Sequence, residues 1–332
     1  MAQALLVWGK ASAQSDNTTT SEESDSSGMM AYDPNFAGNL VLGIIYILLG
    51  FVFSYHCYQH NDKWAICLPI SAITSGIGYF IRLTFDMTVQ LGPFLVMNCL
   101  VVISPTAFLA FNYMLYGRFI TAIDPKFGND TKPGSKMERS KFSFIPPLIV
   151  GRTFIISDII AFFVQISAGG MQAAAGDSDP NLAKIGDNLF LAGVTVQGIS
   201  YLLFTILFTV AFLRLIEDRK RNYPNQLEKG WTGLDMQTLL VVGGLYLSSV
   251  FIIIRSVYRI VEFSQGYQGY LMTHEVFLFV LDAAPLVLAI GVWAFMWPSV
   301  MLDRIKVQTR SVELEAGASR IESGNKDWIP LV

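Results

Sequence analysis

The sequence predicts an all-α membrane protein, a seven-transmembrane helix bundle with its N-terminus outside and its C-terminus in the cytoplasm. Of the 332 residues, 52% are hydrophobic and only 15% are charged, and the mean hydropathy is +0.46. Soluble domains carry about 25% charged residues, so the composition argues against a single water-soluble globular domain. The net charge of −3 argues against a nucleic-acid partner, which requires a basic surface. Three cysteines are too few for a secreted scaffold held by disulfides.

The composition divides the chain into three parts. Residues 11–34 are polar, acidic and rich in serine and threonine. Such a segment cannot bury a core, which predicts a disordered extracellular tail over residues 1–34. We expect a transmembrane domain over residues 35–302 and a polar cytoplasmic tail over residues 303–332.

The middle part contains apolar stretches long enough to cross about 30 Å of hydrocarbon. The seven helices that they predict cover residues 36–57, 64–85, 92–117, 144–168, 188–214, 237–262 and 275–300. Pro69, Pro105 and Pro285 lie inside three of these ranges, and transmembrane helices tolerate proline where neighbours bond the freed carbonyls. Trp64, Trp293 and Trp297 are expected to anchor helix ends at the membrane interface.

Basic residues predict the orientation, because lysine and arginine accumulate on the cytoplasmic side. With the N-terminus outside, the inner segments hold seventeen of the 23 basic residues, and the outer segments hold only Lys10 and Lys184. This asymmetry predicts that the N-terminus is outside. Asn17, which begins an Asn-Thr-Thr sequence, is then an extracellular candidate for glycosylation, whereas Asn129 falls in an inner loop.

Polar side chains occur at membrane depth on five of the predicted helices. Charged groups there cost about 2.5–3.5 kcal/mol each on insertion scales, so they normally face the interior of the bundle. In the predicted topology these side chains converge between the midplane and the outer surface. We therefore predict a polar cavity open toward the outer leaflet. The candidate substrate-binding residues are Arg82, Asp158, Gln165, Gln197, Arg255, Tyr258, Arg259, Glu262, Glu275 and Asp282.

The same residues have a second interpretation, in which they form ion pairs that fix the packing of the helices and bind no ligand. Three arginines face four carboxylates, which leaves one negative charge if all are ionised. A cationic head group would balance this charge, and so would a proton on one of the carboxylates.

Enzymatic catalysis is the weakest hypothesis. His56 and His60 are spaced to share a helix face, but they lie at the predicted inner end, whereas His274 lies at the outer end. About 30 Å of hydrocarbon separates these ends, so one zinc ion cannot bind all three histidines. The sequence contains no Walker A or G-x-S-x-G motif. We therefore expect no cofactor, no metal and no enzymatic activity.

Residues 254–282 carry a distinctive pattern, R-x-x-Y-R-x-x-E-x-x-x-G followed by H-E and by an aspartate seven residues after that glutamate. This pattern resembles the signature of the fungal RTA-like lipid-translocating exporter family. One departure is Ser75, where the resemblance leads us to expect glutamate. Four other segments agree with the family: GYFIR (78–82), SPTAFLAFNYMLYGR (104–118), FIISDIIAFFVQISAGG (154–170) and GVTVQG (193–198).

The resemblance implies a multi-pass plasma-membrane protein that moves, or confers resistance to, amphipathic molecules. Sphingoid long-chain bases are the best-known case, and sterol-like compounds and porphyrins are associated with other members. The leading hypothesis is a translocase whose partners are membrane lipids and a small amphipathic substrate with a polar or cationic head group. The alternative is a seven-helix receptor or stress sensor that responds to lipids or toxic amphiphiles. Against it, the third helix ends in YMLYGRF (113–119) rather than D-R-Y.

Overall fold

The computed structural model describes residues 35–84, 91–124, 140, 142, 146–175, 179–222, 234–265 and 270–322, and this part of the chain contains helices but no strand. Seven segments in it are long and apolar enough to cross a membrane, which confirms the predicted seven-helix bundle. The tail predicted over residues 1–34, with Asn17, lies outside the described residues. The orientation of the termini stays a prediction.

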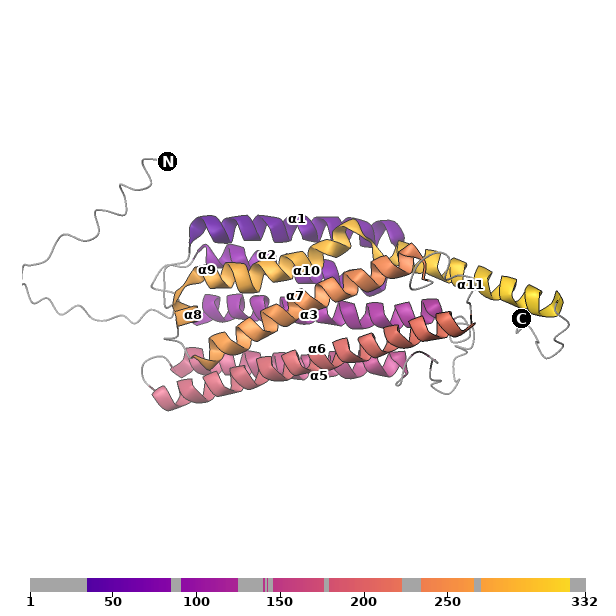
Figure 1. Cartoon of the computed structure of the whole chain (residues 1–332). Coiled ribbons are helices and arrows are strands. Elements are labelled where there is room, and N and C mark those ends of the chain that lie inside the picture. Colours follow the sequence, from indigo (N-terminus) through magenta and orange to yellow (C-terminus); the bar gives the residue numbers. More distant parts are fainter. Residues whose placement is uncertain are drawn as a thin grey trace, which may run out of the picture.

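The helices lie side by side and alternate in direction (Figure 1). Each packs against its neighbours in the chain, and the last spanning helix also packs against the first, which closes the bundle. The six continuous spanning helices are α1 (Phe36–His60), α2 (Cys67–Arg82), α3 (Leu91–Ile123), α5 (Pro147–Ala175), α6 (Pro180–Asn222) and α7 (Met236–Ser264). A short turn of 3₁₀-helix, η1 (Lys63–Ile66), precedes α2.

Asn35, Arg82 and Glu275 lie at one end of the bundle, which the basic residues predict to be the outer end. Asp62 lies at the opposite, predicted inner end. We use these two names below.

The seventh span is built from three pieces: α9 (Glu275–Phe277), the π-helical segment η3 (Leu278–Ala283) and α10 (Ala284–Phe295). One further turn, α8 (Tyr270–Thr273), precedes it. Pro285 explains the irregularity, because proline donates no hydrogen bond to the carbonyl four residues earlier and its ring clashes with that carbonyl. A π-helical turn accommodates both defects and sets the direction of the Asp282 side chain. The Tyr46 hydroxyl of α1 donates to the Ala283 carbonyl at 3.1 Å and holds the segment in place.

A polar junction joins the predicted inner ends of the first and last spans. Asp62 accepts hydrogen bonds from Trp297 Nε1 at 2.8 Å, Ser299 Oγ at 2.9 Å and Trp64 Nε1 at 3.2 Å. The chain turns at Met296 and continues as α11 (Pro298–Glu322), which leads away from the bundle (Figure 1). Most of the predicted cytoplasmic tail is therefore helical in the part that the structure describes.

Two tryptophans depart from the expectation that they anchor a helix end at the interface. Trp293 is 0% and Trp297 is 5% exposed, and both belong to the hydrophobic core. The expectation was wrong for both because the junction at Asp62 and the packing of α11 cover this end of the seventh span. Trp64 is partly buried, its ring stacks on the Phe111 ring, and the Arg118 guanidinium lies over it.

Candidate functional site

The centre of the site is a cluster of charged side chains on α7 and η3. Asp282 receives two hydrogen bonds from Arg259, from Nε at 2.5 Å and from Nη2 at 2.6 Å. Arg255 Nε lies 3.0 Å from the same carboxylate and forms an ion pair with it, but the geometry at Nε does not make this contact a hydrogen bond. Glu262 accepts from Arg259 Nη1 at 3.0 Å and from the Tyr258 hydroxyl at 2.8 Å. We call these five residues the arginine–carboxylate cluster.

Local helix geometry explains how the cluster forms. Arg255, Arg259 and Glu262 are spaced four and three residues apart, so they lie on one face of α7. The π-helical turn carries Asp282 to that face, where its carboxylate meets both guanidinium groups. Asp282 is 3% exposed, and removing charged groups from water this completely requires such pairing.

A second polar group closes the predicted outer end of the bundle. Glu275 accepts from Asn39 Nδ2 at 2.8 Å and from the Asn35 backbone N–H at 2.6 Å. Arg82 Nη2 lies 3.6 Å from the same carboxylate. These contacts join the ends of α1, α2 and α9, so Arg82 and Glu275 have a packing role whatever else they do.

Two glutamines bridge α5 and α6. Gln165 Nε2 donates to Gln197 Oε1 at 3.1 Å, and Gln197 Nε2 donates to the Thr106 hydroxyl of α3 at 3.1 Å. Gly193 explains why the first glutamine fits, because a Cβ added at this glycine would lie 2.8 Å from Gln165 Cγ. The predicted convergence of Gln165 and Gln197 is therefore visible in their direct hydrogen bond.

Asp158 lies apart from all of these groups. It is 1% exposed, and its Oδ2 accepts a hydrogen bond from the Tyr113 hydroxyl at 2.8 Å. Among the described residues it forms no ion pair with Arg82, Arg255 or Arg259. The four carboxylates predicted for one cavity thus divide into three separate environments.

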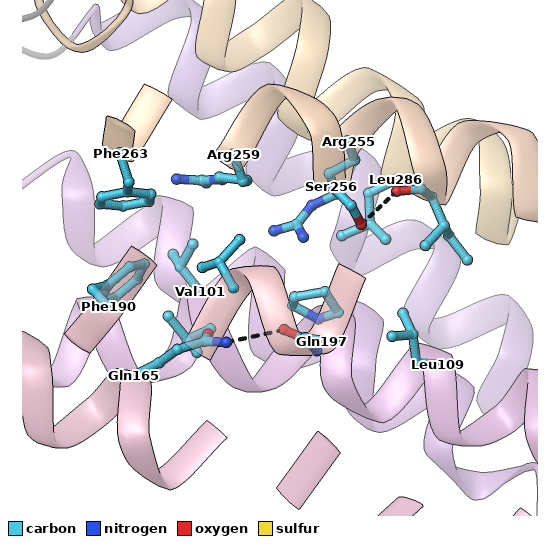
Figure 2. A pocket seen from close by; sticks show the side chains of 14 residues that line it. Val101, Leu109, Gln165, Phe190, Gln197, Arg255, Ser256, Arg259, Phe263 and Leu286 are labelled. Atoms are coloured by element: carbon cyan, nitrogen blue, oxygen red, sulfur yellow. Dashed lines mark hydrogen bonds between the residues drawn. The ribbon is translucent and has the colours of Figure 1, made fainter. Parts of the chain in front are cut away.

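A pocket lies between the arginine–carboxylate cluster and the glutamine pair (Figure 2). In this view the side chains of Arg255 and Arg259 extend from α7 on one side, and Gln165 and Gln197 lie across from them. The volume of the pocket is about 60 Å³, enough for a few water molecules or one small polar head group but too small for a lipid tail. The lining residues are Val101, Val102, Pro105, Leu109, Gln165, Phe190, Val194, Gln197, Ile252, Arg255, Ser256, Arg259, Phe263 and Leu286.

Four of the ten candidate residues line this pocket, namely Arg255, Arg259, Gln165 and Gln197. The other six lie outside its lining: Arg82, Asp158, Tyr258, Glu262, Glu275 and Asp282. Glu262 and Asp282 act on the pocket through the arginines that they hold. The charged surface that a ligand meets is therefore made of guanidinium donors, while the carboxylates that neutralise them are outside the lining.

Sequence reasoning missed the apolar walls of the pocket. Phe190 and Phe263 form an aromatic pair toward its predicted outer side, with ring centroids 4.2 Å apart. Pro105 was a usable signal, because it has no N–H to donate to the Val101 carbonyl and both residues line the pocket. Ser75, at the position where the family resemblance suggests glutamate, is hydrogen-bonded instead to Ser104 of α3.

Arginine and amide donors can bind oxygen atoms of a ligand. Arg259 is engaged by Asp282 and Glu262, whereas the terminal nitrogens of Arg255 form no hydrogen bond within the described residues. Figure 2 shows the Arg255 guanidinium extending into the pocket. The fold and this pocket define a polytopic helical membrane protein with a donor-rich polar site inside its bundle.

The chain belongs to the family described as RTA1 like protein, whose pattern matches residues 68–129 and 135–305. It is 29% identical over 222 residues to "Protoporphyrin uptake protein 1" of Saccharomyces cerevisiae, covering 66% of this chain and 63% of that protein. It is 34% identical over 125 residues to "Lipid-translocating exporter-like protein RTA1" of Ajellomyces capsulatus, covering 36% of this chain and 39% of that protein. It is 26% identical over 178 residues to "Sphingoid long-chain base transporter RSB1" of Saccharomyces cerevisiae strain YJM789, covering 45% of each chain.

The match to the protoporphyrin uptake protein thus spans less than two thirds of that relative's length. No solved structure matches this chain.

Proposed function

We propose that this protein translocates an amphipathic lipid in the plasma membrane and that the pocket holds the lipid's polar head group. Sphingoid long-chain bases and related cationic or sterol-like amphiphiles are the proposed substrates. The names of the relatives support this class, since one refers to a sphingoid long-chain base transporter and another to a lipid-translocating exporter. The observation that carries the proposal is the Arg255 guanidinium, which extends into the pocket with its terminal donors unused among the described residues.

Each wall of the pocket has a role in this proposal. Arg255 and the glutamine pair donate to hydroxyl or other oxygen atoms of the head group, and a cationic amine of the same head group lies away from the two guanidinium groups, because like charges repel. Asp282 holds both arginines at one side of the pocket, and Glu262 holds Arg259. The tail remains among the helices or in lipid, because the cavity holds only a small head group. Binding only the head group suits a protein that handles several amphiphiles, since their tails are not selected.

The experiment uses the purified full chain in liposomes and follows movement of a fluorescent sphingoid base between leaflets. Arg255→Gln removes the charged group whose terminal donors are unused. It is expected to raise the concentration of base at half-saturation at least tenfold, because a hydrogen bond to a charged group contributes about 1.5–3 kcal/mol. Arg152→Gln is the matched control, because Arg152 is an exposed arginine on α5 and does not line the pocket.

Translocation by the wild type that Arg255→Gln weakens and Arg152→Gln leaves intact supports the proposal. Binding of the fluorescent base without movement between leaflets favours the receptor alternative and contradicts translocation. If both variants reach half-saturation at the same concentration of base, the result contradicts the assignment of the pocket as the head-group site.

A further inference from the structure

The ion pairs of the described residues leave over one of the four carboxyl groups that the sequence assigned to the site. Arg82 pairs with Glu275, and the two arginines of α7 pair with Asp282 and Glu262. The remaining carboxyl group is that of Asp158, which is 1% exposed and forms no ion pair within the described part of the chain. The excess negative charge that the sequence suggested therefore has a definite position on α5.

The surroundings of Asp158 are polar but uncharged. Its helix packs against α3 and α6. The titratable groups that face it are the Tyr113 phenol of α3 and the Tyr201 phenol of α6. Its second oxygen, Oδ1, has no hydrogen-bond partner among the described residues, although it is fully buried. The Ser200 hydroxyl lies beside Asp158 and Tyr113, close enough to interact with both.

These groups belong to a polar layer inside the bundle. The Tyr201 hydroxyl accepts from Asn112 Nδ2 at 3.0 Å and shares a hydrogen bond of 3.1 Å with Ser249. Asn112 Nδ2 also donates to Ser248 at 3.2 Å, and all four residues are at most 1% exposed. Asn112 Oδ1 is another buried acceptor without a partner in the described residues.

The polar layer begins one helical turn below the pocket. On α6, Ser200 follows the pocket residue Gln197 by three positions, and on α3, Asn112 follows the pocket residue Leu109 by three. Three residues of α-helix correspond to about 4.5 Å, and both helices run here toward the predicted inner end. Ser249 precedes the pocket residue Ile252 by three on α7, which runs in the opposite direction, so it lies at the same depth. Polar groups thus continue from the pocket toward the middle of the membrane.

We propose that Asp158 is a proton-binding site and that its proton exchanges during translocation, so that movement of the lipid is coupled to a proton. An ionised carboxylate without a cation is strongly disfavoured in a buried, low-dielectric site, so this carboxyl binds a proton in the conformation described. The O–H bond formed on Asp158 takes its proton from one aqueous phase, and its breaking releases the proton to the other phase. The coupling rests on the proposed function.

Linkage between the two sites follows from their positions. When Asp158 loses its proton, the new charge requires donors, and the nearest are Tyr113 and Ser200, the second of which lies one helical turn from the pocket residue Gln197. A head group that binds in the pocket changes the polarity around these donors and therefore how readily Asp158 releases its proton. By reciprocity, the proton on Asp158 changes the affinity of the pocket for the head group.

Two measurements on the reconstituted full chain test the proposal. The first follows a fluorescent sphingoid base and a pH dye enclosed in the liposomes, with and without a pH gradient. The second records the infrared band of protonated carboxylic acids on the purified protein.

The test variant is Asp158→Asn, which keeps the shape of the neutral acid but cannot exchange a proton. The control is Asp187→Asn on α6, which removes a half-buried carboxylate paired with Gln172 outside the pocket. Tyr113→Phe is a second test variant that keeps the acid.

The wild type is expected to translocate several-fold faster with the gradient and to move protons when the lipid is added. Asp158→Asn is expected to lose both responses and one carboxylic acid band, and Asp187→Asn is expected to keep all three. Tyr113→Phe is expected to keep the gradient response but to shift the pH at which translocation is half-maximal. A purely structural role of Tyr113 would leave this pH unchanged.

Wild-type translocation that ignores the gradient, or a gradient response that survives in Asp158→Asn, overturns the coupling and leaves the proposed function standing. No translocation by the wild type overturns the proposed function and the coupling with it. An unchanged infrared band in Asp158→Asn overturns the proton site whatever the transport result.

Discussion

Replacing Asp282 by asparagine removes the negative charge that two arginines of α7 share. The structure assigns three contacts to this carboxylate, two from Arg259 at 2.5 and 2.6 Å and one from Arg255 at 3.0 Å. Breaking a buried ion pair by removing one partner costs about 3–5 kcal/mol, because the other charge is left without compensation. Asparagine keeps one acceptor oxygen, and Glu262 still pairs with Arg259. We therefore expect a loss near the lower limit, about 3 kcal/mol of unfolding free energy.

The assay is reversible unfolding of the purified protein in mixed micelles, with Asp303→Asn as the matched control. Asp303 forms an ion pair with Lys306 at 3.3 Å, but the two side chains are 71% and 49% exposed. Exposed pairs contribute about 0–1 kcal/mol, so the control is expected to unfold almost as the wild type does. A loss below about 1 kcal/mol for Asp282→Asn, equal to the control, would refute the reasoning that buried ion pairs hold α7 against the seventh span.

Two further predictions concern helix packing and topology. Gly50→Ala is expected to destabilise the bundle by about 1–3 kcal/mol, because the added Cβ would lie 2.6 Å from Ile73 Cγ1 at the contact of α1 with α2. Gly170→Ala adds a Cβ with nothing within 4 Å and is expected to be neutral or slightly stabilising in the same unfolding assay; equal losses would contradict the packing argument. If the N-terminus is outside, glycosidase treatment shifts the wild type but not Asn17→Gln on a gel, whereas Asn129→Gln shifts like the wild type. A shift that persists in Asn17→Gln and disappears in Asn129→Gln would reverse the predicted topology.

Hydropathy predicted the number of helices but not all of their lengths: it overestimated the second and seventh spans and underestimated the other five. The fifth predicted span, 188–214, corresponds to α6, which runs from Pro180 to Asn222. Its additional residues include charged side chains at both ends, and a hydropathy window ends where such residues begin, although a helix continues through them. The break of the seventh span was missed for another reason, since a π-helical turn has no hydropathy signal and only Pro285 indicates it.

The candidate site was predictable as a set of residues but not as an arrangement. Spacing placed Arg255, Arg259 and Glu262 on one face of α7, which the structure shows. Spacing could not assign partners, and Asp158 and Asp282 looked alike in the sequence although one pairs with two arginines and the other with Tyr113. That difference depends on which helices pack together, so it is decided by tertiary structure alone.

Photo-crosslinking tests most directly whether the head group of a translocated amphiphile occupies the pocket. A sphingoid base with a photoreactive group beside its hydroxyl groups is added to the reconstituted protein, and the labelled peptides are identified by mass spectrometry. The account predicts labels on α3, α6 and α7 between residues 101–109, 190–197 and 252–263, reduced in Arg255→Gln and competed by unlabelled base. Labels confined to membrane-facing side chains such as Phe51 and Phe163, which are 66% and 62% exposed, would contradict it.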